Sequence, residues 1–230
     1  MSKSLKNVVN PDEVIDEYGA DSFRLYEMFM GPLEASKPWN TDSVSGVSRF
    51  LNKAWRMIVA EDGSLAPEIG DHAMTPDQER ILHQSIKKVD EDTASLDFNT
   101  AISQMMVFVN EFGTAKERNK DAMVSFVLML SSYAPHIAEE FWVILGKEEG
   151  ISYIPFPSYD ESKLVVDEVE ILLQSKGKPK ARIMMSPNMS KEEMEKAALE
   201  IPEVQEIIDG KEIIKMICVP GRLINIVTKG

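Results

Sequence analysis

The sequence has few of the residues that build disulfides or metal sites. It contains one cysteine and three histidines among 230 residues. A disulfide needs two cysteines, so no disulfide framework can form within the chain. No histidine lies at a metal-ligand spacing from another histidine or from Cys218, and no metal site is expected. Cys218 lies in an apolar run, which indicates a small buried core residue.

Long apolar segments are also absent. No run of about 18 apolar residues occurs, so no membrane-spanning helix is expected. The N-terminus has no basic segment followed by an apolar one, and no secretion signal is expected either. These absences favour a cytoplasmic protein without membrane contact, and we expect a monomer. The apolar content of 43% is enough for a core, and the length suits one large domain or two smaller ones.

Positive charge is scarce. The chain has 25 Lys and Arg against 38 Asp and Glu, a formal net charge of −13. That excess of acid argues by itself against nucleic-acid binding, because contacts with phosphates use Lys and Arg. The charge is uneven, however: residues 164–230 hold 10 basic and 11 acidic residues, whereas residues 1–163 hold 15 and 27. Basic surfaces must therefore be sought locally.

The first part of the chain has helical periodicity. Asn10-Pro11 is typical of a helix start and Gly19 of a helix end. Apolar residues then recur at spacings of three and four, which predicts further helices. The expected helices cover residues 20–30, 43–60, 75–96, 98–117 and 120–145. Pro135 removes a backbone donor and should kink the last of them near residues 131–132. The four longer helices are expected to pack as a bundle, with Trp55 in its core.

After residue 163 the pattern changes to short β-branched runs and turns. These predict strands over residues 165–174, 180–185, 212–219 and 223–227. Lys176-Gly177 and Pro220-Gly221 are the predicted turns. Two short helices lie between the strand pairs, the first opened by a capping box at Ser190. The order predicts a small α+β domain of ββααββ type.

Three groups of residues are candidates for binding anions. Ser2, Lys3 and Ser4 combine a point charge with short donors, which can contact a polyphosphate, although an ordinary polar N-terminus has the same composition. A helix places residues at spacings of three and four on one stripe. A regular strand places alternate residues on one face. The stripe is formed by Arg49, Lys53 and Arg56, and the strand face by Lys178, Lys180 and Arg182, with Lys176 and Arg222 as additions.

Several motifs, in order along the chain, resemble class I aminoacyl-tRNA synthetases. MSKS at residues 1–4, NVVNPD at 7–12, YGAD at 18–21 and RLY at 24–26 resemble the segment at and after the KMSKS signature. MFMGPL, PW and RFL, within residues 28–51, resemble the leucyl enzymes in particular. APHIAEEFW at 134–142 resembles a motif of the helical anticodon-binding domain. VPGRLINIV at 219–227 is similar to the end of bacterial-type leucyl enzymes.

This resemblance implies a fold and an activity. The fold would be mainly α, with a remnant of the catalytic loop and stem-contact helices at 1–42, an anticodon-binding-type bundle at 43–160 and a small tRNA-binding domain at 164–230. The family uses ATP, with Mg²⁺, to form leucyl-adenylate and then leucyl-tRNA. Lys3 would contact ATP and stabilise the departing pyrophosphate, with Ser2 and Ser4 in the same loop.

The chain departs from the family pattern in ways that bear on activity. It begins at the methionine of the signature, without the first lysine, and no HIGH tetrapeptide or editing domain is visible. We therefore expect no catalysis, no cofactor and no leucine or ATP binding by this chain alone, and we expect the cut to fall inside the ATP-binding signature. Leu5-Lys6 and Lys176 also replace the residues that many relatives have there.

The remaining expected function is binding of leucine-specific tRNA. In the family the small tail domain contacts the outer corner of tRNA, where the D and T loops meet, which favours Lys176, Lys178, Lys180, Arg182 and Arg222 as contacts. The α-helical stripe is expected to contact phosphates of the tRNA stem. The alternatives are a helical protein-interaction module, which the acidic surface suits, or the equivalent part of an isoleucyl, valyl or methionyl enzyme.

Overall fold

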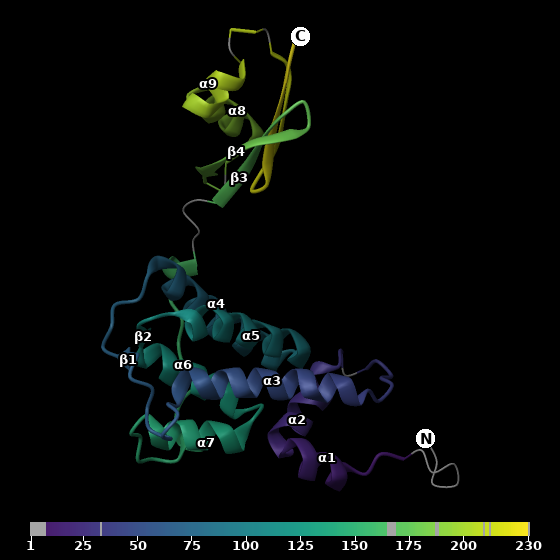
Figure 1. Cartoon of the computed structure of the whole chain (residues 1–230), viewed down its shortest axis with the longest axis vertical. Helices are drawn as coiled ribbons and strands as arrows, with labels where there is room; N and C mark the ends of the chain where they lie inside the picture. Colours follow the sequence, from purple (N-terminus) through teal and green to yellow (C-terminus); the bar gives the residue numbers. More distant parts are fainter. Residues whose placement is uncertain are drawn as a thin grey trace. The chain divides into compact units, whose positions relative to one another are not determined.

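The computed structural model describes residues 8–32, 34–164, 169–186, 189–208, 210–211 and 213–229. Within these ranges the chain is mostly helical and has a small sheet (Figure 1). It divides into two compact units, Met1–Leu164 and Val165–Gly230, called here the helical unit and the tail unit. Ser2, Lys3 and Ser4 lie outside the described residues.

The helical unit begins with two short helices, α1 (Pro11–Tyr18) and α2 (Ala20–Phe29). The Asn10 side chain accepts a hydrogen bond from the Asp12 N–H at 3.2 Å, and Pro11 takes the first helical position. Gly19 has a φ of 86°, a conformation that favours glycine, so the chain turns there directly into α2. The predicted start and end of α1 are confirmed.

The following helices are α3 (Thr41–Ile58), α4 (Pro76–Ala94), α5 (Phe98–Thr114), α6 (Lys120–Ser131) and α7 (Pro135–Ile144). The prediction of one kinked helix over residues 120–145 is wrong, because α6 ends at Ser131 and Pro135 opens a new helix. Steric conflict with a proline ring disfavours helical dihedrals in the preceding residue, and Ala134 has φ −133° and ψ 74°. The proline therefore ends one helix and starts another.

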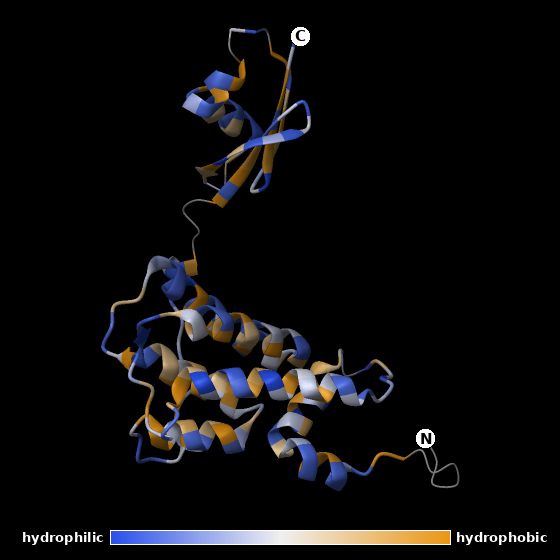
Figure 2. Ribbon diagram, in the orientation of Figure 1, coloured by the Kyte–Doolittle hydropathy of each residue, from blue (hydrophilic) through white to orange (hydrophobic). Residues whose placement is uncertain are grey.

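Stacked phenylalanines join α5 and α6 in the core of the helical unit. The rings of Phe108 and Phe112 are 4.3 Å apart, and those of Phe108 and Phe126 are 5.0 Å apart. All three side chains are fully buried. Burial of each contributes about 1.5–3 kcal/mol. Helix α3 is amphipathic, and Figure 2 shows hydrophobic and hydrophilic residues interspersed along it.

A buried arginine ties the ends of two helices together. Arg118 lies in β2 (Arg118–Asn119), which pairs in parallel with β1 (Ile69–Gly70). Its guanidinium donates to the Met57 carbonyl oxygen at 2.8 Å and to the Phe112 carbonyl oxygen at 2.9 Å. These oxygens belong to the last turns of α3 and α5, where a cation is favourable. Arg118 thereby fixes α3 beside α5. The sequence patterns did not predict these two-residue strands.

The tail unit has a four-stranded sheet with order β4-β3-β6-β5. The strands are β3 (Val169–Ser175), β4 (Lys178–Met185), β5 (Ile213–Val219) and β6 (Leu223–Thr228), and the helices are α8 (Lys191–Leu199) and α9 (Pro202–Ile208). The central pair, β3 and β6, is parallel and the outer pairs are antiparallel. Lys176 and Gly177 turn between β3 and β4 with φ of 50° and 78°, as the sequence predicted.

The tail unit has a hydrophobic core of its own. Ile171, Leu173, Ile224 and Ile226 of the central strands are fully buried, and Met194, Ala198 and Val204 of the two helices pack against them. Cys218 is 4% exposed, which confirms the expected core position, and burial raises the pKa of its thiol. Helices α8 and α9 thus cover one face of the sheet.

Within the described residues, no helix is long and apolar enough to cross a membrane.

Candidate nucleic-acid interface

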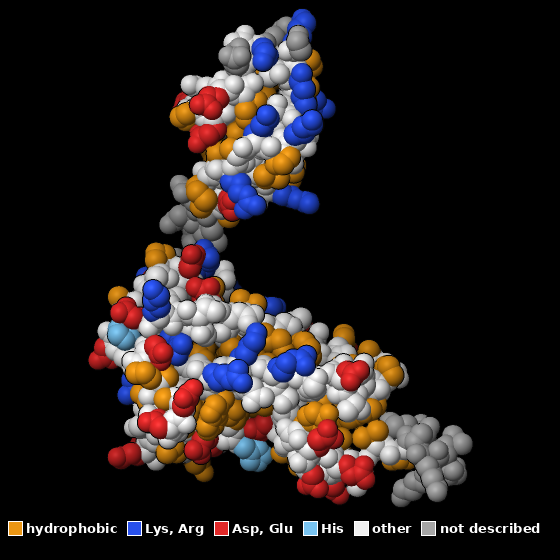
Figure 3. All heavy atoms as spheres, in the orientation of Figure 1, with side chains coloured by type: hydrophobic (Ala, Val, Ile, Leu, Met, Phe, Trp, Pro, Cys, Tyr) orange, Lys and Arg blue, Asp and Glu red, His pale blue; other side chains and the backbone are white. Residues whose placement is uncertain are grey.

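The predicted basic stripe lies on the exposed side of α3. A capping bond from the Asp42 N–H to the Asn40 side chain, 2.9 Å long, starts this helix, and its opposite face is buried. Arg49, Lys53 and Arg56 are all exposed. In Figure 3, Lys and Arg side chains gather over α3. We call these three residues the α3 row.

The α3 row differs from several other cations of the helical unit because it has no acidic partner. The Arg49 guanidinium contacts the Ser45 hydroxyl at 3.2 Å, and Lys53 Nζ contacts the Asn110 side-chain oxygen at 3.3 Å. Among the described residues, no Asp or Glu forms an ion pair with the row. Elsewhere in the unit Arg80, Lys87, Lys88, Arg118 and Lys163 are all within 4.0 Å of a carboxylate. No described carboxylate therefore competes with an external anion for the row.

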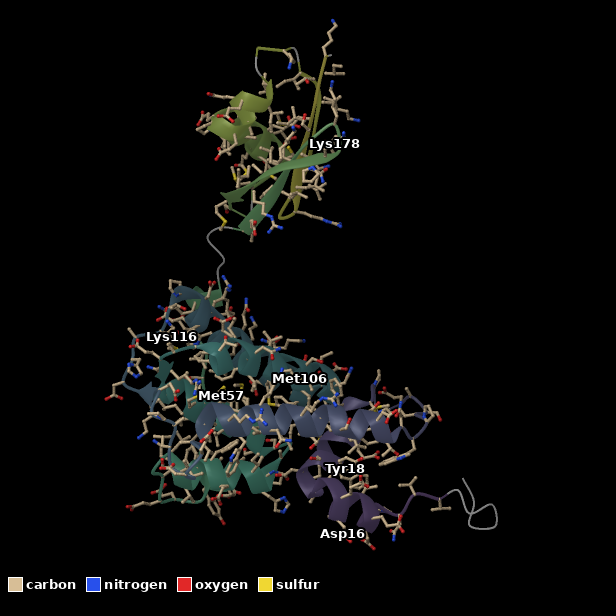
Figure 4. The ribbon with its side chains drawn as sticks, in the orientation of Figure 1. Asp16, Tyr18, Met57, Met106, Lys116 and Lys178 are labelled. Atoms are coloured by element: carbon tan, nitrogen blue, oxygen red, sulfur yellow. The ribbon has the colours of Figure 1, made fainter. Side chains whose placement is uncertain are left out.

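A groove runs between the α3 row and α5. It consists of two adjoining hollows of about 220 and 190 Å³, which share Lys53, Val109 and Asn110. Met57 and Met106, labelled in Figure 4, come from α3 and α5 and give the groove an apolar floor. Cations on one wall and the Asn110 amide on the other suit a sugar–phosphate backbone, which is anionic on one side and uncharged on the other.

Helix α2 supplies polar contacts to the break between α6 and α7. The Asp21 carboxylate accepts a hydrogen bond from the Ile137 N–H at 2.8 Å and lies 2.8 Å from His136 Nδ1. The Arg24 guanidinium donates to the carbonyl oxygens of Ser132 and Tyr133 at 3.3 Å. An anion thus caps the start of α7 and a cation the end of α6, each with the favourable sign.

The sequence patterns did not single out Asp21, Arg24 or His136 as partners. A signal was present, because Ala134, at the N-cap of α7, has no side chain that could cap the helix. The expectation for Trp55 was wrong: this side chain is 37% exposed. It packs against Phe141 with ring centres 5.6 Å apart, and its helix position lies beside the row rather than at the centre of the buried face.

In the tail unit the predicted strand face is broken by a bulge. Leu173 pairs with Ala181 and Gln174 pairs with Pro179, so Lys180 is an extra residue on β4. Lys180 and Ala181 both line a hollow of about 530 Å³ beside α9, together with Glu203 and Glu206. The single face expected for Lys178, Lys180 and Arg182 is therefore wrong, because the bulge interrupts the alternation on which it depended.

The cations of the tail unit also differ in their partners. Arg182 donates to Glu170 at 2.9 Å, so its charge is partly neutralised. Lys176, Lys178 and Arg222 have no acidic partner among the described residues. The sheet face opposite α8 and α9 includes exposed hydrophobic side chains, with Met184 at 56% and Ile217 at 40%. Figure 3 shows Lys and Arg side chains gathered on the strand side of the unit, and Figure 4 labels Lys178 near the hairpin turn.

Comparisons with known proteins identify related chains. The family model "Anticodon-binding domain of tRNA ligase" matches residues 79–197, and "tRNA synthetases class I (I, L, M and V)" matches residues 1–37. A leucine–tRNA ligase from Rhodopirellula baltica is 50% identical over 232 residues, which cover 100% of this chain and 24% of that protein. The chain thus spans about a quarter of the length of this curated relative.

A solved structure gives the same relationship. It is a ternary complex of LeuRS from Agrobacterium radiobacter K84 with tRNA and LeuAMS. The match has a TM-score of 0.64 and 27% sequence identity, and it covers 100% of this chain and 31% of that one. The family model of the anticodon-binding domain covers more than half of the chain. The chain therefore belongs to the anticodon-binding family of tRNA ligases, within the class I tRNA synthetases.

Proposed function

We propose that this chain binds tRNA as part of a leucine–tRNA ligase. The observation that carries the proposal is the α3 row: Arg49, Lys53 and Arg56 lie together without an acidic partner, whereas five other cations of the unit are ion-paired. Phosphate is the anion that such a row fits, because each cation can donate to a phosphate oxygen. The printed names of the two relatives support tRNA as the source of that phosphate.

The tail unit provides the second contact in this proposal. Lys176, Lys178 and Arg222, with Lys180 and the paired Arg182 as weaker contributors, would bind the outer corner of tRNA where the D and T loops meet. Exposed hydrophobic side chains on the sheet, such as Met184 and Ile217, add contact area for bases and riboses there. The ββααββ order serves this role because two helices cover one face of the sheet and leave the other available.

The reaction of the whole enzyme is part of the same proposal. ATP, with Mg²⁺, and leucine would give leucyl-adenylate, and the leucyl group would then pass to the tRNA. Lys3, with Ser2 and Ser4, would contact ATP and stabilise the charge of the departing pyrophosphate. Residues 1–42 would belong to that loop and the stem-contact helices, 43–160 to the anticodon-binding-type bundle and 164–230 to the tRNA-contacting tail. We propose that the protein acts in the cytoplasm and as a monomer.

The test is tRNA binding across a range of salt concentrations. We expect the chain to bind leucine-specific tRNA at low salt, with log K falling linearly as log salt concentration rises. The triple variant Arg49→Gln/Lys53→Gln/Arg56→Gln should bind more weakly and lower that slope by about one for each phosphate contact removed.

A control variant separates local contacts from net charge. Arg80→Gln/Lys87→Gln/Lys163→Gln removes the same charge from cations that are already ion-paired in the same unit. It should keep the wild-type slope. Equal slopes in the two triple variants would contradict a contact at the α3 row. Absence of binding at low salt would overturn the proposed function and favour a protein-interaction module.

A further inference from the structure

A hollow of about 420 Å³ lies where α2, α3 and α7 meet, beside the α3 row but outside the groove between α3 and α5. Its lining residues combine an aromatic ring with hydrogen-bonding side chains. They are Tyr18, Ser48, Asn52, Trp55 and His136, together with Gly19, the α2 residues from Ala20 to Ser22, Leu51 and Ile137. Tyr18, labelled in Figure 4, marks the end of the hollow at α1.

Trp55 gives this hollow a flat apolar surface. Part of the indole packs on Phe141, with ring planes inclined by 37°, and 37% of the residue stays exposed. Single exposed hydrophobic residues are common on proteins. An exposed indole that lines a concave surface among free polar groups is a different case, because a planar partner can stack on the ring and bury it.

Two polar side chains at the hollow have hydrogen-bonding groups available. The exposed Asn52 amide offers a donor and an acceptor. Asp21 holds His136 through Nδ1 at 2.8 Å, which orients the ring and leaves Nε2 without a partner among the described residues. Because Nδ1 is occupied by Asp21, Nε2 is the ring nitrogen that a ligand can contact. The hollow therefore presents one aromatic face with donors and acceptors beside it.

The position of Asn52 connects the hollow to the α3 row. Asn52 follows Arg49 by three residues and precedes Arg56 by four, so both arginines are its neighbours on the helix surface. Trp55 follows Asn52 by three residues on the other side. If a phosphate binds between Arg49 and Arg56, the base of the same nucleotide would therefore lie over Asn52 and point towards Trp55.

Charge at the far end of the hollow selects which part of a nucleotide can enter. Helix α1 carries the exposed acids Asp12, Glu13, Asp16 and Glu17, and the last of these is next to Tyr18. Asp16 is labelled in Figure 4. Together with Asp21 these carboxylates repel a phosphate group, whereas an uncharged base meets no such repulsion.

We propose that this hollow binds one unstacked base of the tRNA whose phosphates contact the α3 row. The base stacks on Trp55 and forms hydrogen bonds through its edge with Asn52 and His136, as single-stranded RNA does at aromatic platforms. This inference rests on the proposed function and adds base recognition to phosphate binding.

Tryptophan emission of the chain, titrated with leucine-specific tRNA, tests the inference. Bound tRNA should quench the emission, and Trp55→Phe should remove that part of the quenching while keeping most of the affinity. Trp55→Ala should weaken binding by about fivefold to a hundredfold, the effect of losing one stacked base. The salt slope should stay at its wild-type value in both variants, because stacking releases no counterions.

A second variant covers the case in which Trp55→Ala fails to fold. The Asn52 side chain is exposed and has no hydrogen bond among the described residues, so Asn52→Ala should fold normally. It should weaken binding about fivefold or more. Binding of tRNA with unchanged Trp55 emission, or with full affinity in Asn52→Ala, would overturn the base site and leave the phosphate row in place. Loss of all tRNA binding in the wild-type chain would overturn both proposals.

Discussion

The two units of the chain present their basic residues in different ways. Residues 1–163 carry 27 acids and 15 bases, and five cations of the helical unit are ion-paired, whereas the α3 row has no acidic partner among the described residues. Residues 164–230 carry 11 acids and 10 bases, and the exposed sheet face holds both the Arg182–Glu170 ion pair and exposed hydrophobic side chains. In an acidic protein, the pairing of individual charges therefore identifies a candidate phosphate-binding surface better than the net charge does.

The units also differ in how their stability can be observed. Each has its own core cluster. All three tryptophans, Trp39, Trp55 and Trp142, lie in the helical unit, and the one cysteine lies in the tail unit. Tryptophan emission therefore reports unfolding of the first unit, and the accessibility of Cys218 reports unfolding of the second. Changes in one core should leave the signal of the other unaffected.

The largest expected effect comes from Arg118→Ala in the helical unit. The substitution leaves carbonyl oxygens of α3 and α5 without their charged donor in a buried position. We expect the free energy of unfolding to fall by about 3–5 kcal/mol. Denaturant titration followed by tryptophan emission measures it.

The control for this prediction is Arg80→Ala. Arg80 pairs with Asp77 near the surface, so its removal should cost less than about 1 kcal/mol. A similar loss in the two variants would contradict the role of Arg118 as the residue that fixes α3 beside α5. A changed rate of Cys218 alkylation in Arg118→Ala would show that the two units are energetically coupled.

The next effect is Ile224→Ala in the tail unit. Ile224 is fully buried in β6, and loss of its side chain should destabilise the unit by about 2–5 kcal/mol. The measurement is the alkylation of Cys218 at pH 8. Because burial raises the pKa of the native thiol above its ordinary 9.0, the native form holds little thiolate at this pH, and reaction proceeds through the unfolded tail.

In Ile224→Ala, Cys218 should therefore be alkylated at least about tenfold faster than in the wild type, while the tryptophan transition is unchanged. Val219→Ala, at a site that is 38% exposed, is the matched control and should change the rate little. A shift of the tryptophan transition in Ile224→Ala would contradict the independence of the two units, because it would mean that the two cores unfold together.

The smallest effect concerns Glu170, which pairs with Arg182 on the exposed sheet face. Glu170→Gln removes the competing carboxylate and frees Arg182 for phosphate. We expect tRNA affinity to rise by about twofold to fivefold, the range for an exposed ion pair. Filter binding at low salt measures this change. Weaker binding in Glu170→Gln would place Arg182 outside the interface and leave Lys176, Lys178 and Arg222 as the tail contacts.

Much of the fold followed from the sequence, since helical spacing and capping residues are local signals. Asn10, Gly19 and the turn at Lys176-Gly177 behaved as predicted. The wrong prediction of one continuous helix across Pro135 also has a local cause. A proline can kink a helix or begin one, and the local sequence does not distinguish the two. The capping contacts between Asp21 and His136 span 115 residues, and no periodicity reports such a distance.

The candidate site was predictable in part for the same reason. A spacing of four and three places Arg49, Lys53 and Arg56 on one side of a helix, and that placement needs no tertiary information. The bulge at Lys180 could not be predicted from the sequence, because the register of β4 depends on its partner strand. The exposure of Trp55 could not be predicted either, since it depends on how closely α2 and α7 approach α3.

Local sequence signals were enough to predict most of the helices, the four strands of the tail unit, the basic row on α3 and the motifs that relate the chain to class I synthetases. Which cations lack an acidic partner depends on the tertiary structure, because ion pairs such as Lys163 with Glu79 join residues far apart in the chain. The tertiary structure also decided that Asn52 and Trp55 border a hollow. Local propensities act over a few residues, whereas charge pairing and concave surfaces arise only when distant segments pack together.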